Sequence, residues 1–151
     1  MIDRFERFCF AVAAMSRYIQ KIETDELEKM GLKGSYALYL IILDRYPQGL
    51  TATELCEQCE KDKAAVSRAI AAMEKQGLVS RNSGTHSPYR APIVLTEAGK
   101  QAADHVRQKA IVAVSHAGTG ISDEDRITMY ATLEKIAANL HIISKEGIPH
   151  Q

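Results

Sequence analysis

The chain has 151 residues, the usual length of one domain, and 46% of them are hydrophobic against 25% charged. This composition excludes a large multidomain enzyme, general disorder and a fibrous repeat. Nineteen basic residues balance nineteen acidic ones, so net charge does not indicate a nucleic-acid partner and charge has to be considered locally. Three cysteines are too few for a disulfide-stapled secreted fold and fit a reducing cytoplasm.

The first predicted element is an amphipathic helix over residues 2–22, where apolar residues recur at every third or fourth position. Its segment 8–15 has the hydrophobicity of a signal-peptide core, but the acidic Asp3 and Glu6 interrupt the basic flank that such a peptide needs. No run approaches the roughly 18 apolar residues that span a bilayer. We therefore expect a cytoplasmic protein without a membrane partner.

Two helices are expected before the middle of the chain. Asp25 with Glu28 three residues later predicts the start of a short helix that stops at Gly31. Residues 36–46 then predict a helix that is apolar nearly all round, which places it at the centre of the core. Pro47–Gly49 breaks the chain after it.

The next two helices are short and close together. Thr51 or Thr53 is expected to cap a two-turn helix over residues 52–59. After a turn, Asp62 is a good N-cap for a helix that should end at Gly77.

The sequences GLVSR (residues 77–81) and APIVLT (residues 91–96) are strand candidates, and the polar, turn-rich residues 82–90 between them predict a hairpin. Two helices joined by a short turn and followed by a hairpin describe a winged helix-turn-helix.

Two further helices are predicted, one from Glu97 that is broken at Gly118–Gly120, and a last one capped by Ser122 with Asp125. Because the winged unit is already a closed small core, the apolar stripes of the terminal helices lack a surface to cover them within one chain. This favours a partner chain, with a monomeric bundle of the end helices as the alternative. The stripe of the last helix consists of Ile127, Tyr130, Leu133, Ile136, Ala137, Leu140 and Ile143.

The stretch LTATELCEQCEKDKAAVSRAIAAMEKQGLVSR followed by IVLTEAGK resembles the recognition-helix and post-wing signature of the MarR family of bacterial transcription regulators, and the resemblance covers nearly the whole chain. It implies a mainly α fold with a small β-hairpin wing (α+β). It also implies a homodimer, with dimerisation helices over 1–32 and 97–151 and a DNA-binding winged helix-turn-helix over 33–96. The chain departs from the family pattern in its turn, Glu60 and Lys61, and at the wing, where Ser87 and Tyr89 replace an Asp-Xaa-Arg motif.

Residues 61–90 carry six basic side chains against two acidic ones, a local charge of +4 where the resemblance expects DNA. Helical spacing turns Val66, Ile70 and Met73 inward and leaves small and polar residues outward. We expect Arg68 to bind a guanine edge and Ala64 or Ala65 to touch a thymine methyl.

Phosphate contacts that hold the register are expected chiefly from the two threonines at 51 and 53, from His86 and from Arg90. The alternatives are a solvated helix charge for Arg68 and an exposed loop residue without a contact for His86. The expected DNA-contacting set is Thr51, Thr53, Lys63, Ala64, Ala65, Ser67, Arg68, Arg81, His86 and Arg90.

Cys56 and Cys59 form a Cys-Xaa-Xaa-Cys motif, which can bind zinc or act as a redox pair. We reject both roles, because Leu55 and Cys59 fall on the buried side of their helix and no second ligand pair stands at zinc spacing. No glycine-rich phosphate loop or nucleophile–base arrangement is present either, so no metal, cofactor or enzymatic activity is expected.

The segment FCFAVAAMSR resembles the N-terminal helix of the organic-hydroperoxide-sensing branch of the family, and Cys9 occupies the position of its reactive cysteine. The two positions that align with the activating tyrosines of that branch are Glu23 and Gly34, although Tyr36 is close in sequence. Two interpretations of Cys9 stay open, a packed helical cysteine and a redox sensor.

The function expected from these features is that of a dimeric, sequence-specific DNA-binding regulator on a pseudo-palindromic operator. We expect it to act as a repressor that an unidentified small molecule releases. The alternatives are a redox-sensing regulator through Cys9 and a winged-helix protein-interaction module that does not bind DNA. The local charge and the small, polar outer face of the helix after Asp62 favour DNA binding, because an interaction module more often exposes an apolar patch there.

Overall fold

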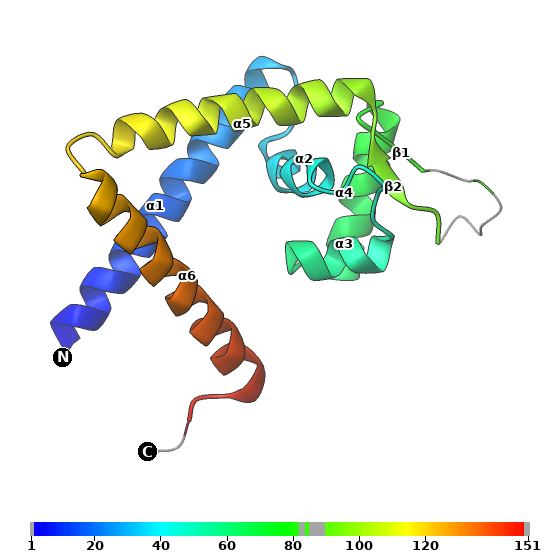
Figure 1. The fold of residues 1–151 in the computed structure, drawn as a ribbon. Helices are drawn as coiled ribbons and strands as arrows, with labels where there is room; N and C mark the ends of the chain where they lie inside the picture. The colour runs from blue at the N-terminus through cyan, green and yellow to red at the C-terminus, as the bar shows by residue number, and fades with distance from the viewer. Residues whose placement is uncertain (1, 82–83, 85–89, 150–151) are drawn as a thin grey trace. The chain divides into compact units, whose positions relative to one another are not determined.

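The computed structural model describes residues 2–81, 84 and 90–149. Its element order confirms the expected mainly α fold with a small β-hairpin (Figure 1). Met1–Ala113 form one compact unit and Val114–Gln151 a second. The elements are α1 (Ile2–Lys29), a 3-10 turn η1 (Gly34–Tyr36), α2 (Ala37–Asp44), α3 (Ala52–Cys59), α4 (Lys63–Lys75), β1 (Val79–Arg81), β2 (Ile93–Leu95), α5 (Glu97–Ala117) and α6 (Asp123–Glu146).

The predicted starts of three helices are confirmed. Thr51 caps α3 in a capping box with Glu54, in which the Thr51 hydroxyl accepts the Glu54 N–H and the Glu54 carboxylate accepts the Thr51 N–H. Asp62 caps α4 by accepting the Ala65 N–H at 2.8 Å. Ser122 caps α6 by accepting the Asp125 N–H at 3.1 Å. Side chains thus satisfy backbone donors that a helix start leaves open.

The prediction of a separate short helix from Asp25 is wrong, because α1 continues without interruption to Lys29. Within the longer helix Asp25 lies one turn after Lys21 and forms an ion pair with it, with Nζ and Oδ2 2.8 Å apart. This i, i+4 pair supports a helix interior, whereas an N-cap needs extended backbone. Gly31, with a φ of +73°, does follow the end of the helix as predicted.

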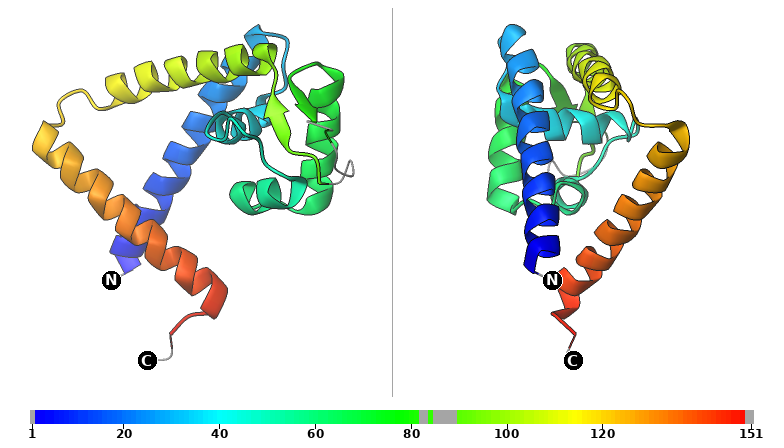
Figure 2. Two further views of the ribbon diagram at one scale, coloured as in Figure 1. Left: turned by 45° about the vertical axis from the view of Figure 1, so that its right-hand side comes forward. Right: turned by 90° about the vertical axis from the view of Figure 1, so that its left-hand side faces the viewer.

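The apolar helix α2 lies at the centre of the winged-helix region, as its composition predicted. Tyr39, Leu40 and Leu43 are buried in a cluster that also contains Leu27 of α1 and Val106 of α5. Within this unit α2 packs against α3 and β2, α3 against α4, and α4 against β1 (Figure 2). Full burial of such a side chain contributes about 1.5–3 kcal/mol, so this shared cluster holds α3, α4 and the hairpin against α2.

Polar contacts link α5 to α1 and α2. The Nε2 atom of His105 lies 3.0 Å from Oε2 of Glu26, and the guanidinium of Arg107 forms an ion pair with Asp44. Glu26 also accepts a hydrogen bond from Lys29. This bond and the contact with His105 hold the pKa of the Glu26 carboxyl below its usual value.

The wing is an antiparallel hairpin in which Val79 pairs with Leu95 and Arg81 with Ile93. Leu50 extends the ladder through an isolated bridge, since the Ile93 N–H donates to its carbonyl at 2.8 Å. The predicted hairpin is confirmed at its base, and most of the turn between the strands lies outside the described residues.

The terminal helices expose their apolar residues in the single chain. None of the residues of α6 is buried, and Leu140 on its stripe is 51% exposed. On α1, Phe5, Val12 and Met15 are exposed as well. A partner chain would explain both stripes, and the dimerisation role of 1–32 and 97–151 stays a prediction. Among the described residues no helix is long and apolar enough to cross a membrane.

Candidate nucleic-acid interface

The two faces of α4 are divided as predicted. Val66, Ile70 and Met73 are buried against the core. The opposite face exposes Ala64, Ser67 and Arg68, whereas Ala65 is half-buried. Small side chains near the start of this helix leave room for a nucleic-acid backbone to approach, and Arg68 supplies a planar group with paired donors.

The turn between α3 and α4 contains a strained residue. Glu60 has a φ of +50° and a ψ of +40°, the left-handed conformation that glycine adopts more easily. Here the Glu60 and Lys61 amides bond back to the carbonyls of Glu57 and Cys56, which closes the turn. Lys61 and Lys63 are both exposed at the start of α4. The departure from the family pattern at this turn therefore still gives a tight connection between the two helices.

The two threonines at the start of α3 differ in their surroundings. The Thr51 hydroxyl accepts the Glu54 N–H and donates to the Glu54 carboxylate at 2.8 Å, so its single O–H donor is already engaged. Hydrogen bonds from Thr51 hold the pKa of the Glu54 carboxyl below its usual value. Thr53 is exposed. The predicted phosphate contact therefore fits the Thr53 side chain better than that of Thr51.

The basic residues of the wing lie at its base. Arg81 is half-buried at the end of β1, and its Nε lies 3.7 Å from Oε2 of Glu74 on α4. Arg90 is exposed before β2. His86, the remaining wing residue of the predicted set, lies outside the described residues, as do Ser87 and Tyr89. The contacts predicted for all of these residues stay predictions.

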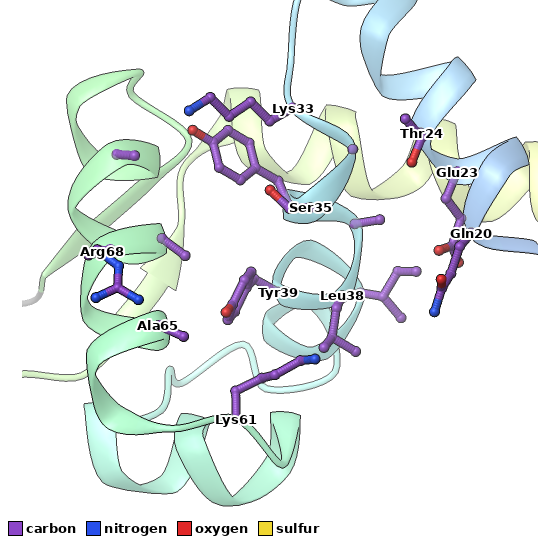
Figure 3. A pocket seen from close by; sticks show the side chains of 16 residues that line it. Gln20, Glu23, Thr24, Lys33, Ser35, Leu38, Tyr39, Lys61, Ala65 and Arg68 are labelled. Carbon is purple, nitrogen blue, oxygen red and sulfur yellow. The ribbon is translucent and has the colours of Figure 1, made fainter. Parts of the chain in front are cut away.

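A pocket of about 640 Å³ lies beside this surface and was not predicted from the sequence (Figure 3). Its lining comes from the last third of α1, from η1 and α2, and from the face of α4 that carries Ala65 and Arg68. Because these segments are far apart in the sequence, no periodic pattern connects them. The ionisable lining residues are Glu23, Lys33, Tyr36, Tyr39, Lys61 and Arg68.

The pocket lining is more cationic than anionic. Lys33, Lys61 and Arg68 line it together with one carboxylate, Glu23. Burial raises the pKa of the Glu23 carboxyl above its usual value. In Figure 3 the Glu23 side chain lies on the α1 side of the pocket, whereas Lys61 and Arg68 lie on the α4 side. This lining suits a small molecule with an apolar body and a negative charge.

Cys56 is half-buried and Cys59 is buried on the inner side of α3 next to Leu55, as predicted. Burial raises the pKa of the Cys59 thiol to about 11. Among the described residues, no group of three or more His, Cys, Asp or Glu side chains is placed to hold a metal ion. The packing role of Cys59 thus fits the structure, and a reactive thiol there does not.

Iodoacetamide is expected to alkylate Cys59 far more slowly in the folded protein than in the unfolded one. Only the thiolate reacts, and with a pKa near 11 about one thiol in a thousand is ionised at pH 8. Mass spectrometry of peptides after labelling, with and without denaturant, measures this difference. Equal labelling rates in the two states would contradict the buried, unreactive assignment.

Cys9 is half-buried on α1. Glu23, which aligns with one of the activating tyrosine positions, lines the pocket, as does Gly34 at the start of η1. The redox role of Cys9 stays a prediction.

The fold and the basic, small-residue face of α4 define a winged helix-turn-helix protein. Residues 30–87 match the model of the MarR family. No curated protein matches the chain.

Solved structures show that the similarity in fold extends over nearly the whole chain. One is a putative MarR family transcriptional regulator from Listeria monocytogenes complexed with a 26mer DNA, with 20% identity, 95% of this chain and 97% of that chain covered, and a TM-score of 0.80. A second is the transcriptional regulator PA3341, with 26% identity, 89% and 98% covered, and a TM-score of 0.72. A third is the MepR–DNA complex from Staphylococcus aureus, with 19% identity, 87% and 97% covered, and a TM-score of 0.76.

Proposed function

We propose that the protein is a sequence-specific DNA-binding transcription regulator and that α4 is its recognition helix. The observation that carries the proposal is the outer face of α4, where Ala64, Ser67 and Arg68 are exposed beside Lys61 and Lys63. The fold shared with two protein–DNA complexes supports it. No residue is assigned a catalytic role.

Base and phosphate contacts come from different residues in this proposal. Arg68 reads a guanine through paired hydrogen bonds, and Ala64 or Ala65 touches a thymine methyl. Lys63 and Thr53 neutralise or bind phosphates and fix the register. Arg81 and Arg90 add positive charge at the base of the wing, where the field attracts the adjacent backbone.

The active form is a homodimer on a pseudo-palindromic operator. The exposed apolar stripes of α1 and α6 support this, because single chains rarely expose such continuous apolar faces. Two recognition helices then address half-sites about one helical turn apart. As a bacterial transcription regulator the dimer acts in the cytoplasm, where the DNA is.

The regulator acts as a repressor that a small molecule releases, and the pocket beside α4 is the site of that molecule. Arg68 and Ala65 belong to the pocket lining and also to the predicted DNA-contacting set. A ligand that pairs with Arg68 therefore competes with DNA for the same guanidinium. Because the two ligands share one side chain, binding of either ligand lowers the affinity for the other by the same factor.

Salt dependence of binding to a random-sequence duplex tests the proposal without knowledge of the operator. If each subunit neutralises about four phosphates, the slope of log affinity against log salt is near −7 for the dimer. Fluorescence anisotropy of a labelled duplex over a series of salt concentrations gives this slope. A slope near zero would contradict the proposal and favour a winged-helix module that binds another protein.

A redox-sensing regulator is the second candidate, and it depends on Cys9. Oxidation of this thiol to a sulfenic acid would add a polar group to the helix of a proposed dimer interface. If Cys9 is the sensor, cumene hydroperoxide lowers the operator affinity of the wild type and leaves that of Cys9→Ser unchanged. Equal behaviour of the two proteins under oxidant would exclude Cys9 as the switch.

A further inference from the structure

Thr96 joins the end of the recognition helix to the start of α5. Its hydroxyl donates to the carbonyl of Gly77, with the two oxygens 2.6 Å apart. The same hydroxyl oxygen accepts the Gly99 N–H at 3.1 Å, which caps the first turn of α5. Its backbone N–H donates to the carbonyl of Leu78 at 3.0 Å. Thr96 therefore connects the residue that follows the end of α4 to the first turn of α5.

The α4 side of this junction is a closed helix end. Gly77 has a φ of +72°, its N–H donates to the Glu74 carbonyl, and the Leu78 N–H donates to the Met73 carbonyl at 2.9 Å. These two bonds form a Schellman motif, which gives the last turn of α4 a defined direction. The Gly77 carbonyl accepts the hydrogen bond from Thr96, and its position depends on the orientation of the recognition helix.

The α5 side of the junction is in direct contact with the same backbone. A Cβ atom on Gly99 would lie 2.0 Å from the Leu78 carbonyl oxygen, so only a glycine allows this approach. Gly99 is buried, and Ala102, Ala103 and Val106 follow it into the core. The first turns of α5 thus cannot tilt without moving the backbone that ends α4.

The far part of α5 carries exposed apolar residues. Ile111 and Val112 are 55% and 54% exposed and lie on the segment proposed to form the dimer. From Thr96 to Ile111 the helix is about 22 Å long, so a tilt of about 5° at one end displaces the other by about 2 Å. One base-pair step is about 3.4 Å. A small tilt of α5 at the Thr96 junction is therefore sufficient to alter the half-site spacing to which the dimer binds best.

We propose that Thr96 is a positioning residue that sets the separation of the two recognition helices in the dimer, through its bridge between Gly77 and Gly99. The inference depends on the proposed function, since it concerns how the dimer selects its operator. Thr96 contacts no base in this scheme. It determines the half-site spacing that the protein accepts, while Arg68 and its neighbours determine the sequence.

The test compares Thr96→Val, which keeps the β-branched shape and removes the hydroxyl, with Thr96→Ser, which keeps the hydroxyl. Affinity is measured on the selected operator and on versions with one base pair added or removed between the half-sites. The readout is the spacing ratio, defined as the Kd on an altered duplex divided by the Kd on the selected one. Thermal melting followed by circular dichroism records folding, and Thr96→Ala provides the same hydroxyl deletion if the valine variant is unfolded.

The expected result is a lower spacing ratio for Thr96→Val, by about threefold to tenfold, and a wild-type ratio for Thr96→Ser. Thr132→Val is the matched control, because it makes the same side-chain change at an exposed position of α6 outside the predicted stripe, where the hydroxyl donates to the Thr128 carbonyl and not to this junction. Its ratio should equal that of the wild type.

An equal loss of affinity on every duplex would overturn the inference, because it would show a stability effect alone. An unchanged ratio for Thr96→Val would also overturn it, as would a Thr96→Ser variant that does not keep the wild-type ratio or a changed ratio in the Thr132→Val control. A wild-type protein that binds none of the duplexes overturns the proposed function as well, and this outcome is recognised before any variant is made.

Discussion

Leu140→Asp is expected to dissociate the homodimer, or to unfold the chain if the monomer is unstable. Leu140 is 51% exposed on α6 in the single chain and lies on the apolar stripe that the dimer is proposed to cover. A carboxylate placed there in the dimer would be desolvated without a partner, which costs several kcal/mol. Because folding and assembly are linked, the loss appears in the association equilibrium and in thermal stability.

Sedimentation equilibrium of the wild type and the variant at micromolar concentration measures this effect. Ala138→Asp is the matched control, since it adds the same charge to an exposed position of α6 outside the predicted stripe. The control should remain a dimer. A folded wild-type monomer at this concentration would contradict the proposed assembly, and so would a Leu140→Asp variant as dimeric as the control.

Arg68→Ala is expected to weaken binding to the selected operator by about 1–3 kcal/mol, and binding to random duplex much less. The reason is that paired hydrogen bonds to a guanine edge exist only on the correct sequence. Arg68 is exposed on α4 and also lines the pocket, so its guanidinium is accessible both to DNA and to a small molecule in the pocket.

Lys63→Ala is the comparison for Arg68→Ala. Lys63 is exposed at the first position of α4, where a phosphate contact is expected. Its loss from both subunits should weaken specific and random binding equally and reduce the magnitude of the salt slope by about two. An equal loss on both duplexes for Arg68→Ala would reassign that residue to the phosphate-contacting group.

Local signals predicted the helix starts well. Thr51, Asp62 and Ser122 all cap the helices that follow them. A short polar side chain directly before a segment with helical apolar periodicity is well placed to accept an unpaired backbone N–H of the first turn. The inward stripe of α4 was also predictable from spacing alone. The outward face follows from it, and this is the part of the candidate site that sequence reasoning located.

Other features needed the three-dimensional arrangement. Asp25 has the side chain of a helix cap, but the propensity and packing of a long α1 outweigh that local preference, and the residue pairs with Lys21 instead. The pocket unites residues from α1, α2 and α4, and no local pattern connects them. The Thr96 bridge joins residues 19 positions apart, a contact that the motif IVLTEAGK does not reveal by itself.

Selection of bound duplexes from a random-sequence pool tests whether the dimer reads an inverted repeat through two copies of α4. The purified 151-residue chain is mixed with the pool, bound DNA is recovered and sequenced, and the enriched motif is examined for symmetry. We expect an inverted repeat with half-site centres about 10 base pairs apart, contacted through two copies of α4. Recovery of no enriched sequence, or of a single element without a repeat, would contradict it.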